Sequence, residues 1–179
     1  MQVDAFYRRL LANKPETAVY IEKMRDFTIT PGKLLVPVYL VANPEEGSGG
    51  GEANGGHLVV ECQERPDPLP FLIHETMHYL LRPYSEKIKN ESDSAGVDSQ
   101  VINEGLAYAM EGLTEDADRL PNYLVQNIAR GKTAADRYTQ FYMAGIVIRP
   151  LLRQALQNGE TIAGFLPKAI KEWQHIQGH

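Results

Sequence analysis

Hydrophobic side chains recur at helical spacing along most of the chain. Residues 2–13 and 15–26 predict two short helices, because Pro15 suits the first turn of the second one. Later segments with the same spacing predict helices over 69–82, 99–114, 120–130, from the capping box Thr133–Asp136 to about 148, and 161–176. Pro150 predicts a kink or restart, Asn158-Gly159 a stop, and Pro167 an interruption of the last helix.

Strand-like segments occur only in the first third of the chain. Residues 34–41 and 57–62 are rich in β-branched and apolar side chains, and Pro37 favours an edge position or a bulge for the first of them. Residues 43–56 are glycine-rich and predict a long loop, and the polar residues 84–98 predict an exposed loop. The pattern predicts an α+β fold.

Length and composition favour one structural unit over residues 1–179. Its 179 residues, 43% of them hydrophobic, suffice for one core, with an N-terminal lobe over 1–66 and a helical lobe over 67–179. The net charge is −5 and the 18 lysines and arginines are scattered, which argues against a nucleic-acid partner. The lone Cys62 excludes an internal disulfide and a cysteine-rich zinc site.

The sequence carries no signal for a membrane or for export. No apolar run approaches the roughly 20 residues that span a bilayer, so we expect no membrane partner. The N-terminus lacks the apolar core and cleavage site of a secretory signal. We therefore expect a cytoplasmic protein. The alternative is a catalytic segment of an exported precursor.

The chemistry of the chain centres on the pentapeptide His74-Glu75-Thr76-Met77-His78, a HExxH sequence inside an apolar run. Helix positions four apart differ by only about 40° around the axis, so both imidazoles can face one metal ion. Glu75 can then reach a water molecule on that ion. The spacing is typical of zinc hydrolases. The competing interpretation is a pair of surface histidines with no metal.

A catalytic zinc ion takes a third protein ligand and keeps one position for water. The metzincin pattern fails, because Leu81 and Tyr84 stand where it needs glycine and histidine. The remaining histidines are not at useful spacing: His57, His175 and His179. Glu104, in the segment Asn103–Glu111, is the better choice. The small residues Gly105 and Ala107 are expected to let its helix approach the HExxH helix closely.

The pair of motifs HETMH and NEGLAYAME resembles the zinc site of the gluzincin metallopeptidases, and is most similar to the aminopeptidase N family. This resemblance implies a truncated, thermolysin-like zincin domain. It implies Zn²⁺ held by His74, His78 and Glu104. Glu111 becomes the partner that orients a ligating imidazole, with a plain surface charge as the alternative.

The resemblance extends to the substrate and the oxyanion. It implies an antiparallel edge strand within residues 51–61, which holds an extended substrate at Ala53 and Asn54. Tyr142, in a Tyr-x-x-Gly sequence ending at Gly145, is implied as the oxyanion donor, with Tyr138 as the alternative. The family's exopeptidase motif GAMEN is absent, so aminopeptidase specificity does not follow.

These residues together favour a zinc-dependent peptidase that acts on an extended peptide or protein. The metal would lower the pKa of its water, and Glu75 would act as general base. The alternative is a non-catalytic zinc-binding module that binds peptides or another protein. Glu75 favours the enzyme, because a purely structural zinc site has no need for a base.

Overall fold

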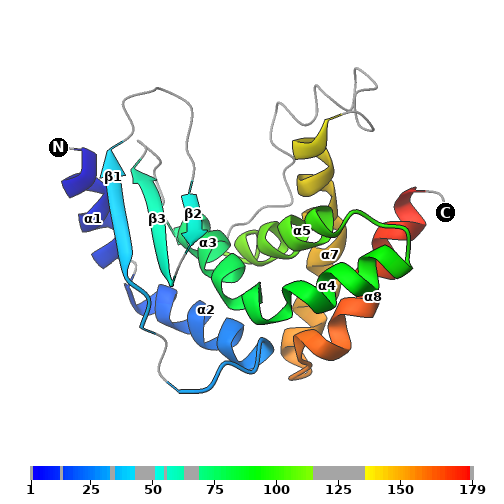
Figure 1. Ribbon diagram of the computed structural model, residues 1–179. Coiled ribbons are helices and arrows are strands. Elements are labelled where there is room, and N and C mark those ends of the chain that lie inside the picture. Colours follow the sequence, from blue (N-terminus) through cyan, green and yellow to red (C-terminus); the bar gives the residue numbers. More distant parts are fainter. Residues whose placement is uncertain are drawn as a thin grey trace.

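A computed structural model describes residues 2–12, 14–32, 35–42, 51–54, 56–62, 69–114 and 136–177. Within these ranges the chain is a mostly helical α+β protein with a small sheet near the N-terminus. Figure 1 shows the sheet on one side of the molecule, helices α4, α5, α7 and α8 on the other, and α3 between them.

The elements before the HExxH segment are α1 (Gln2–Ala12), α2 (Lys14–Phe27), β1 (Val38–Ala42), β2 (Gly51–Asn54) and β3 (His57–Cys62). The later elements are α3 (Leu69–Leu81), the 3₁₀ turn η1 (Arg82–Tyr84), α4 (Ser85–Ser94), α5 (Ser99–Glu111), α7 (Arg137–Gln157) and α8 (Ile162–Gln177). The two predicted N-terminal helices and the HExxH helix are confirmed to within two residues. The predicted helix over 120–130 and residues 133–135 lie outside the described residues.

The sheet has the order β1-β3-β2, so β3 is its central strand. Strand β1 runs parallel to β3, with Val38 opposite Leu58. Strand β2 runs antiparallel to β3, with Gly51 opposite Val60. Side chains of β3 alternate between partly buried and buried, as a strand with one covered face requires. Phe6 of α1 packs with Val60 and Cys62 on that face.

The predicted loop over 43–56 was wrong for residues 51–54, which form β2. Glycine has low strand propensity, so the local residue pattern does not indicate this strand. The edge strand implied by the resemblance within 51–61 is present, but as one arm of a hairpin: β2 is the edge and β3 is its inner neighbour.

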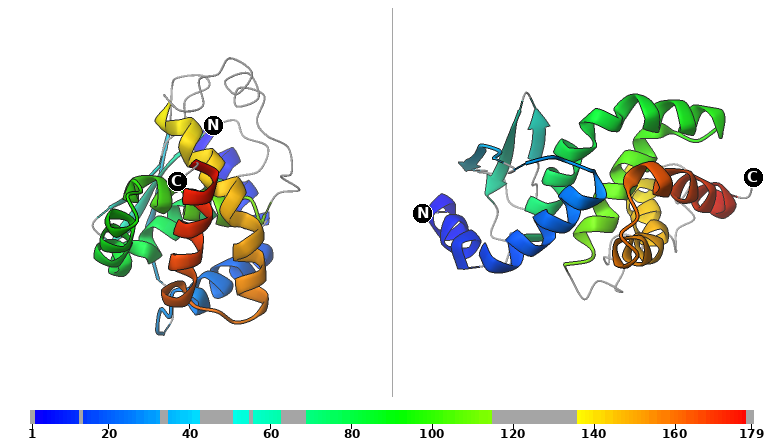
Figure 2. Two further views of the ribbon diagram at one scale, coloured as in Figure 1. Left: turned by 90° about the vertical axis from the view of Figure 1, so that its right-hand side faces the viewer. Right: turned by 90° about the horizontal axis from the view of Figure 1, so that it is seen from below.

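The main core lies between the helices rather than under the sheet. Buried side chains from six helices form one cluster, including Met24, Met77, Ile102, Ile148 and Phe165. Figure 2 shows α7 and α8 side by side, and α2 running beneath α3. Burial of this apolar surface is the main contribution that fixes the helices relative to one another.

The predicted exposed loop over 84–98 was wrong, because residues 85–94 form α4. Only Ile88 and Ser92 of this helix are buried, so its apolar stripe is too narrow to recognise in the sequence. The ion pairs Lys87–Glu91 and Lys89–Asp93, each between residues four apart, stabilise the helix along its exposed face. Gly96, with a φ of 69°, follows the end of the helix.

Helices α5 and α7 cross at small residues. A Cβ on Gly105 would lie 2.7 Å from Ala144 Cβ, and one on Gly145 would lie 2.5 Å from Tyr108 Cβ. The close approach that Gly105 permits is therefore to α7, and the expectation that it would face the HExxH helix was wrong. The two glycines instead bring Tyr142 of α7 beside Tyr108 of α5.

Both prolines predicted to disturb helices lie inside continuous ones. Helix α7 begins after its N-cap Asp136 and continues through Pro150 to Gln157. Helix α8 continues through Pro167. Within the described residues, no helix is both long enough and apolar enough to cross a membrane.

Candidate metal centre

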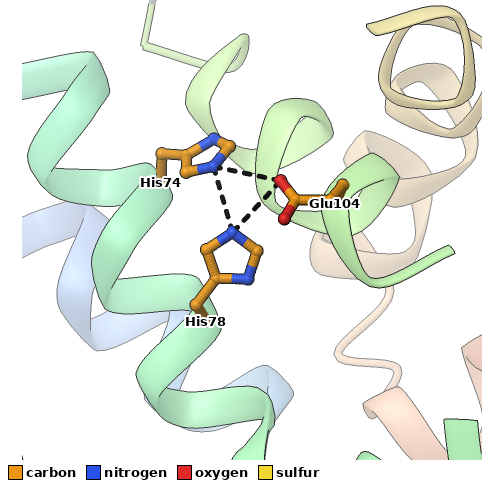
Figure 3. A group of neighbouring side chains, drawn as sticks. All are labelled: His74, His78 and Glu104. Carbon is orange, nitrogen blue, oxygen red and sulfur yellow. Dashed lines mark hydrogen bonds and ion pairs between the residues drawn. The ribbon is translucent and has the colours of Figure 1, made fainter. Parts of the chain in front are cut away.

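Helix α3 presents His74 and His78 from adjacent turns of one face. Figure 3 shows both imidazoles pointing toward Glu104 of α5, with their Nε2 atoms nearest to it. His74 is 6% exposed, and the His78 side chain is 18% exposed. The apolar residues Ile73, Met77 and Leu80 of the same helix are buried in the core and fix its rotation. The amphipathic pattern of α3 thus aims the two histidines at α5.

The three side chains are spaced as ligands of one zinc ion would be. The two Nε2 atoms lie 3.0 Å apart, and Glu104 Oε2 lies 3.6 Å from that of His74 and 3.4 Å from that of His78. Tetrahedral ligands at about 2.0–2.1 Å from a zinc ion would be separated by about 3.3 Å. The group of His74, His78 and Glu104 could therefore hold a metal ion with little movement.

Each histidine has a second partner that fixes its tautomer. His74 Nδ1 donates to Glu111 Oε2 at 2.9 Å, and His78 Nδ1 donates to Asn103 Oδ1 at 2.7 Å. Because both Nδ1 atoms donate, a neutral ring directs the lone pair of its Nε2 toward the centre. Two nitrogen lone pairs and a carboxylate oxygen then converge, which is unfavourable unless a cation lies between them. The donor set fits a zinc ion.

The carboxylates around His74 favour a positive charge between the two imidazoles and Glu104. Burial lowers the pKa of His74, but the carboxylates of Glu104 and Glu111 outweigh it and raise this pKa to about 9. Burial raises the pKa of Glu104, but the two imidazoles outweigh it and lower this pKa to about 2. A metal ion would compete with a proton for the same lone pairs, so it would be attracted by the same arrangement.

Glu75 directly follows His74 in the chain, and its side chain lies against the edge strand β2. Its side chain is only 5% exposed, and burial raises the pKa of its carboxyl group, while His74 and His78 partly oppose the shift. Gly51 of β2 lies so close that a Cβ there would be 2.6 Å from Glu75 Oε1. The strand can take this position because residue 51 has no side chain.

Tyrosine rings continue outward from His74. The Tyr108 ring lies 4.4 Å from the His74 ring, and the Tyr142 ring stacks on Tyr108 at 4.0 Å between centroids. Tyr142 is therefore separated from His74 by the ring of Tyr108. Tyr138, the alternative donor, is 69% exposed and its ring contacts Phe141.

The edge strand is joined to the end of α3 by a hydrogen bond. Arg82 Nη2 donates to the carbonyl oxygen of Ala53, and the same guanidinium lies 5.6 Å from the centroid of the Tyr79 ring. Asn54 ends the strand opposite His57. Ala53 and Asn54 are thus on the edge strand beside α3, as the resemblance implies.

Three residues of the site were missed from the sequence. Asn103 and Tyr108 lie on α5 beside the predicted ligand, and Tyr108 could have been found because Glu104, Tyr108 and Glu111 follow the helical spacing i, i+4, i+7. Arg82 lies seven residues after Glu75, directly after the end of α3, and this spacing is a signal of the same kind.

Comparisons of the chain with protein-family models, with characterised protein sequences and with solved structures found no match. The geometry of this site and the motifs that form it are therefore the basis for proposing a function.

Proposed function

We propose that the protein is a zinc-dependent peptidase of the gluzincin type. The observation that carries the proposal is the convergence of His74, His78 and Glu104 with Glu75 buried beside them. A bound zinc ion would lower the pKa of a water molecule and polarise a substrate carbonyl. A site that serves only structure would close the fourth position with another protein ligand, and the described residues supply three.

The residues of the chain have separate roles in this reaction. Glu75 takes a proton from the attacking water as its oxygen bonds to the carbonyl carbon, and then gives that proton to the amine as the C–N bond breaks. The products are a carboxylate and an amine. The raised pKa of Glu75 supports this role, because a base with a pKa nearer neutrality can also return the proton.

Tyr142 donates a hydrogen bond to the oxyanion in this proposal. Its support is the stack that places it one ring from His74. The high exposure of Tyr138 makes it the weaker choice. Strand β2 pairs with the backbone of an extended substrate, since it is the edge strand next to Glu75.

The test compares the protein with Glu75→Gln, after metal analysis of both. We expect about one zinc ion per chain in each protein, and chelator-sensitive cleavage of a peptide library by the wild type only. The variant should lose activity by at least about a hundredfold, the lower range for general-base catalysis. Equal turnover by both proteins would exclude Glu75 as the base. Zinc and peptide binding without turnover in the wild type would indicate a non-catalytic peptide-binding module instead.

A further inference from the structure

Arg82 is a half-buried cation on the same side of α3 as the proposed base. Glu75 and Tyr79 of α3 and Arg82, the first residue of the turn η1 that continues it, follow the spacing i, i+4, i+7, so their side chains lie near one face. A separation of seven residues corresponds to about 10 Å along a helix axis. An extended peptide covers this length in about three residues.

The edge strand lies along this same face. Gly51 contacts Glu75 at one end of β2, and the carbonyl of Ala53 accepts from Arg82 at the other. A substrate that pairs with β2 and presents its carbonyl to the metal centre would therefore pass near Arg82. This step rests on the proposed function.

Arg82 has more donors than its bond to Ala53 uses. A guanidinium carries five N–H groups, and among the described residues the hydrogen bond found for it is the one to Ala53. Among the side chains that the structure describes, no carboxylate lies within ion-pair distance of Arg82. The Tyr79 ring supports one side of the group. A planar fork held in this way matches the two oxygens of a carboxylate.

We propose that Arg82 is a substrate-carboxylate subsite, and that the protein prefers peptides with an anionic group about three residues from the scissile bond. That group is either the C-terminal carboxylate, which would make the enzyme act near the ends of peptides, or the side chain of an aspartate or glutamate. Arg82 can bind it while keeping its bond to Ala53, because the two partners use different N–H groups.

The experiment measures equilibrium binding of matched short peptides to the zinc-loaded Glu75→Gln protein. The pairs differ only in a free or amidated C-terminus, and a second series of amidated peptides carries glutamate or glutamine near that end. We expect the anionic member of one series to bind on the order of tenfold more tightly, as a charge-assisted bidentate contact would give. The series that shows the difference identifies the source of the carboxylate.

Arg82→Gln should remove this preference, so that it weakens binding of the anionic peptide about tenfold more than binding of its neutral partner. Arg82→Lys should restore part of the preference, because it keeps the charge but not the fork. Arg8→Gln, at an exposed position of α1, is the matched control and should keep the full preference. Zinc affinity and the melting temperature are measured for each variant to show that the fold is kept.

Two results would overturn the proposal. If Arg82→Gln lowers the affinity for acidic and for neutral peptides by the same factor, Arg82 only supports β2 through Ala53. If neither series shows a preference in the parent protein, no carboxylate subsite exists. Chelator-sensitive cleavage by the wild type is scored separately, so loss of the subsite and loss of the proposed peptidase activity give different results.

Discussion

The metal centre and the edge strand β2 lie against the same helix, α3, but they are held there differently. His74, His78 and Glu104 come from two long helices whose buried faces share one core, and both histidines have a second partner. Strand β2 has four residues. It touches α3 through Gly51 at Glu75, and it touches the turn η1 directly after α3 through Ala53 at Arg82. Packing in the helical core therefore positions the candidate metal ligands, and a few local interactions position the edge strand.

The largest effect should come from removing a ligand. Glu104→Ala leaves the two imidazoles without the carboxylate, so zinc affinity should fall well beyond the 10–100-fold that loss of an outer partner costs. Competition with a chromophoric chelator measures it. Glu86→Ala, exposed on α4, is the control. Unchanged affinity in Glu104→Ala would remove Glu104 from the metal centre.

The next effect tests the edge strand. In Gly51→Ala the new Cβ would lie 2.6 Å from Glu75 Oε1, so the tip of the Glu75 side chain must shift away from it. We expect kcat to fall by up to about a hundredfold, the effect of a misplaced catalytic group. Zinc affinity should stay the same, because the ligands are not touched. Gly164→Ala, at an exposed position of α8, should change neither quantity.

A smaller loss of zinc affinity is expected when the hydrogen-bond partner of a ligand, rather than the ligand itself, is changed. Glu111→Gln keeps the shape of the side chain but replaces the charged acceptor of His74 Nδ1 with an amide oxygen. Zinc affinity should fall by about tenfold, at the lower end of the range for such partners. The control is Glu172→Gln on α8. An affinity equal to that of the wild type would make Glu111 a bystander.

The smallest effect concerns Tyr108, whose ring lies between His74 and Tyr142. Tyr108→Ala should weaken zinc binding a few-fold, since it removes one contact that fixes the imidazole. Tyr108→Phe keeps the ring and should restore the wild-type affinity. The visible spectrum of the cobalt-substituted proteins reports the ligand geometry. Identical spectra for all three proteins would contradict this role.

Sequence periodicity predicted that side chains from two helices would converge, and three of them form a group that could hold a metal ion. His74, His78, Glu104 and Glu111 lie on two helices, where spacing along the chain fixes direction in space. It failed where contacts between distant segments decide the structure. Strand β2 depends on its pairing with β3, and Gly105 faces α7 because of how the helices cross. Arg82 reaches Ala53 only after both segments are placed.

The three glutamates around the centre have a consequence for which ions the site selects. Glu104 and Glu111 supply two formal negative charges, which match those of a divalent cation, and Glu75 supplies a third. With a dication bound, the cluster would keep one surplus negative charge, and in the proposed reaction that charge lies on Glu75, the general base. A monovalent ion would leave more repulsion unbalanced, while a trivalent ion would cancel the surplus and hold Glu75 as a counterion.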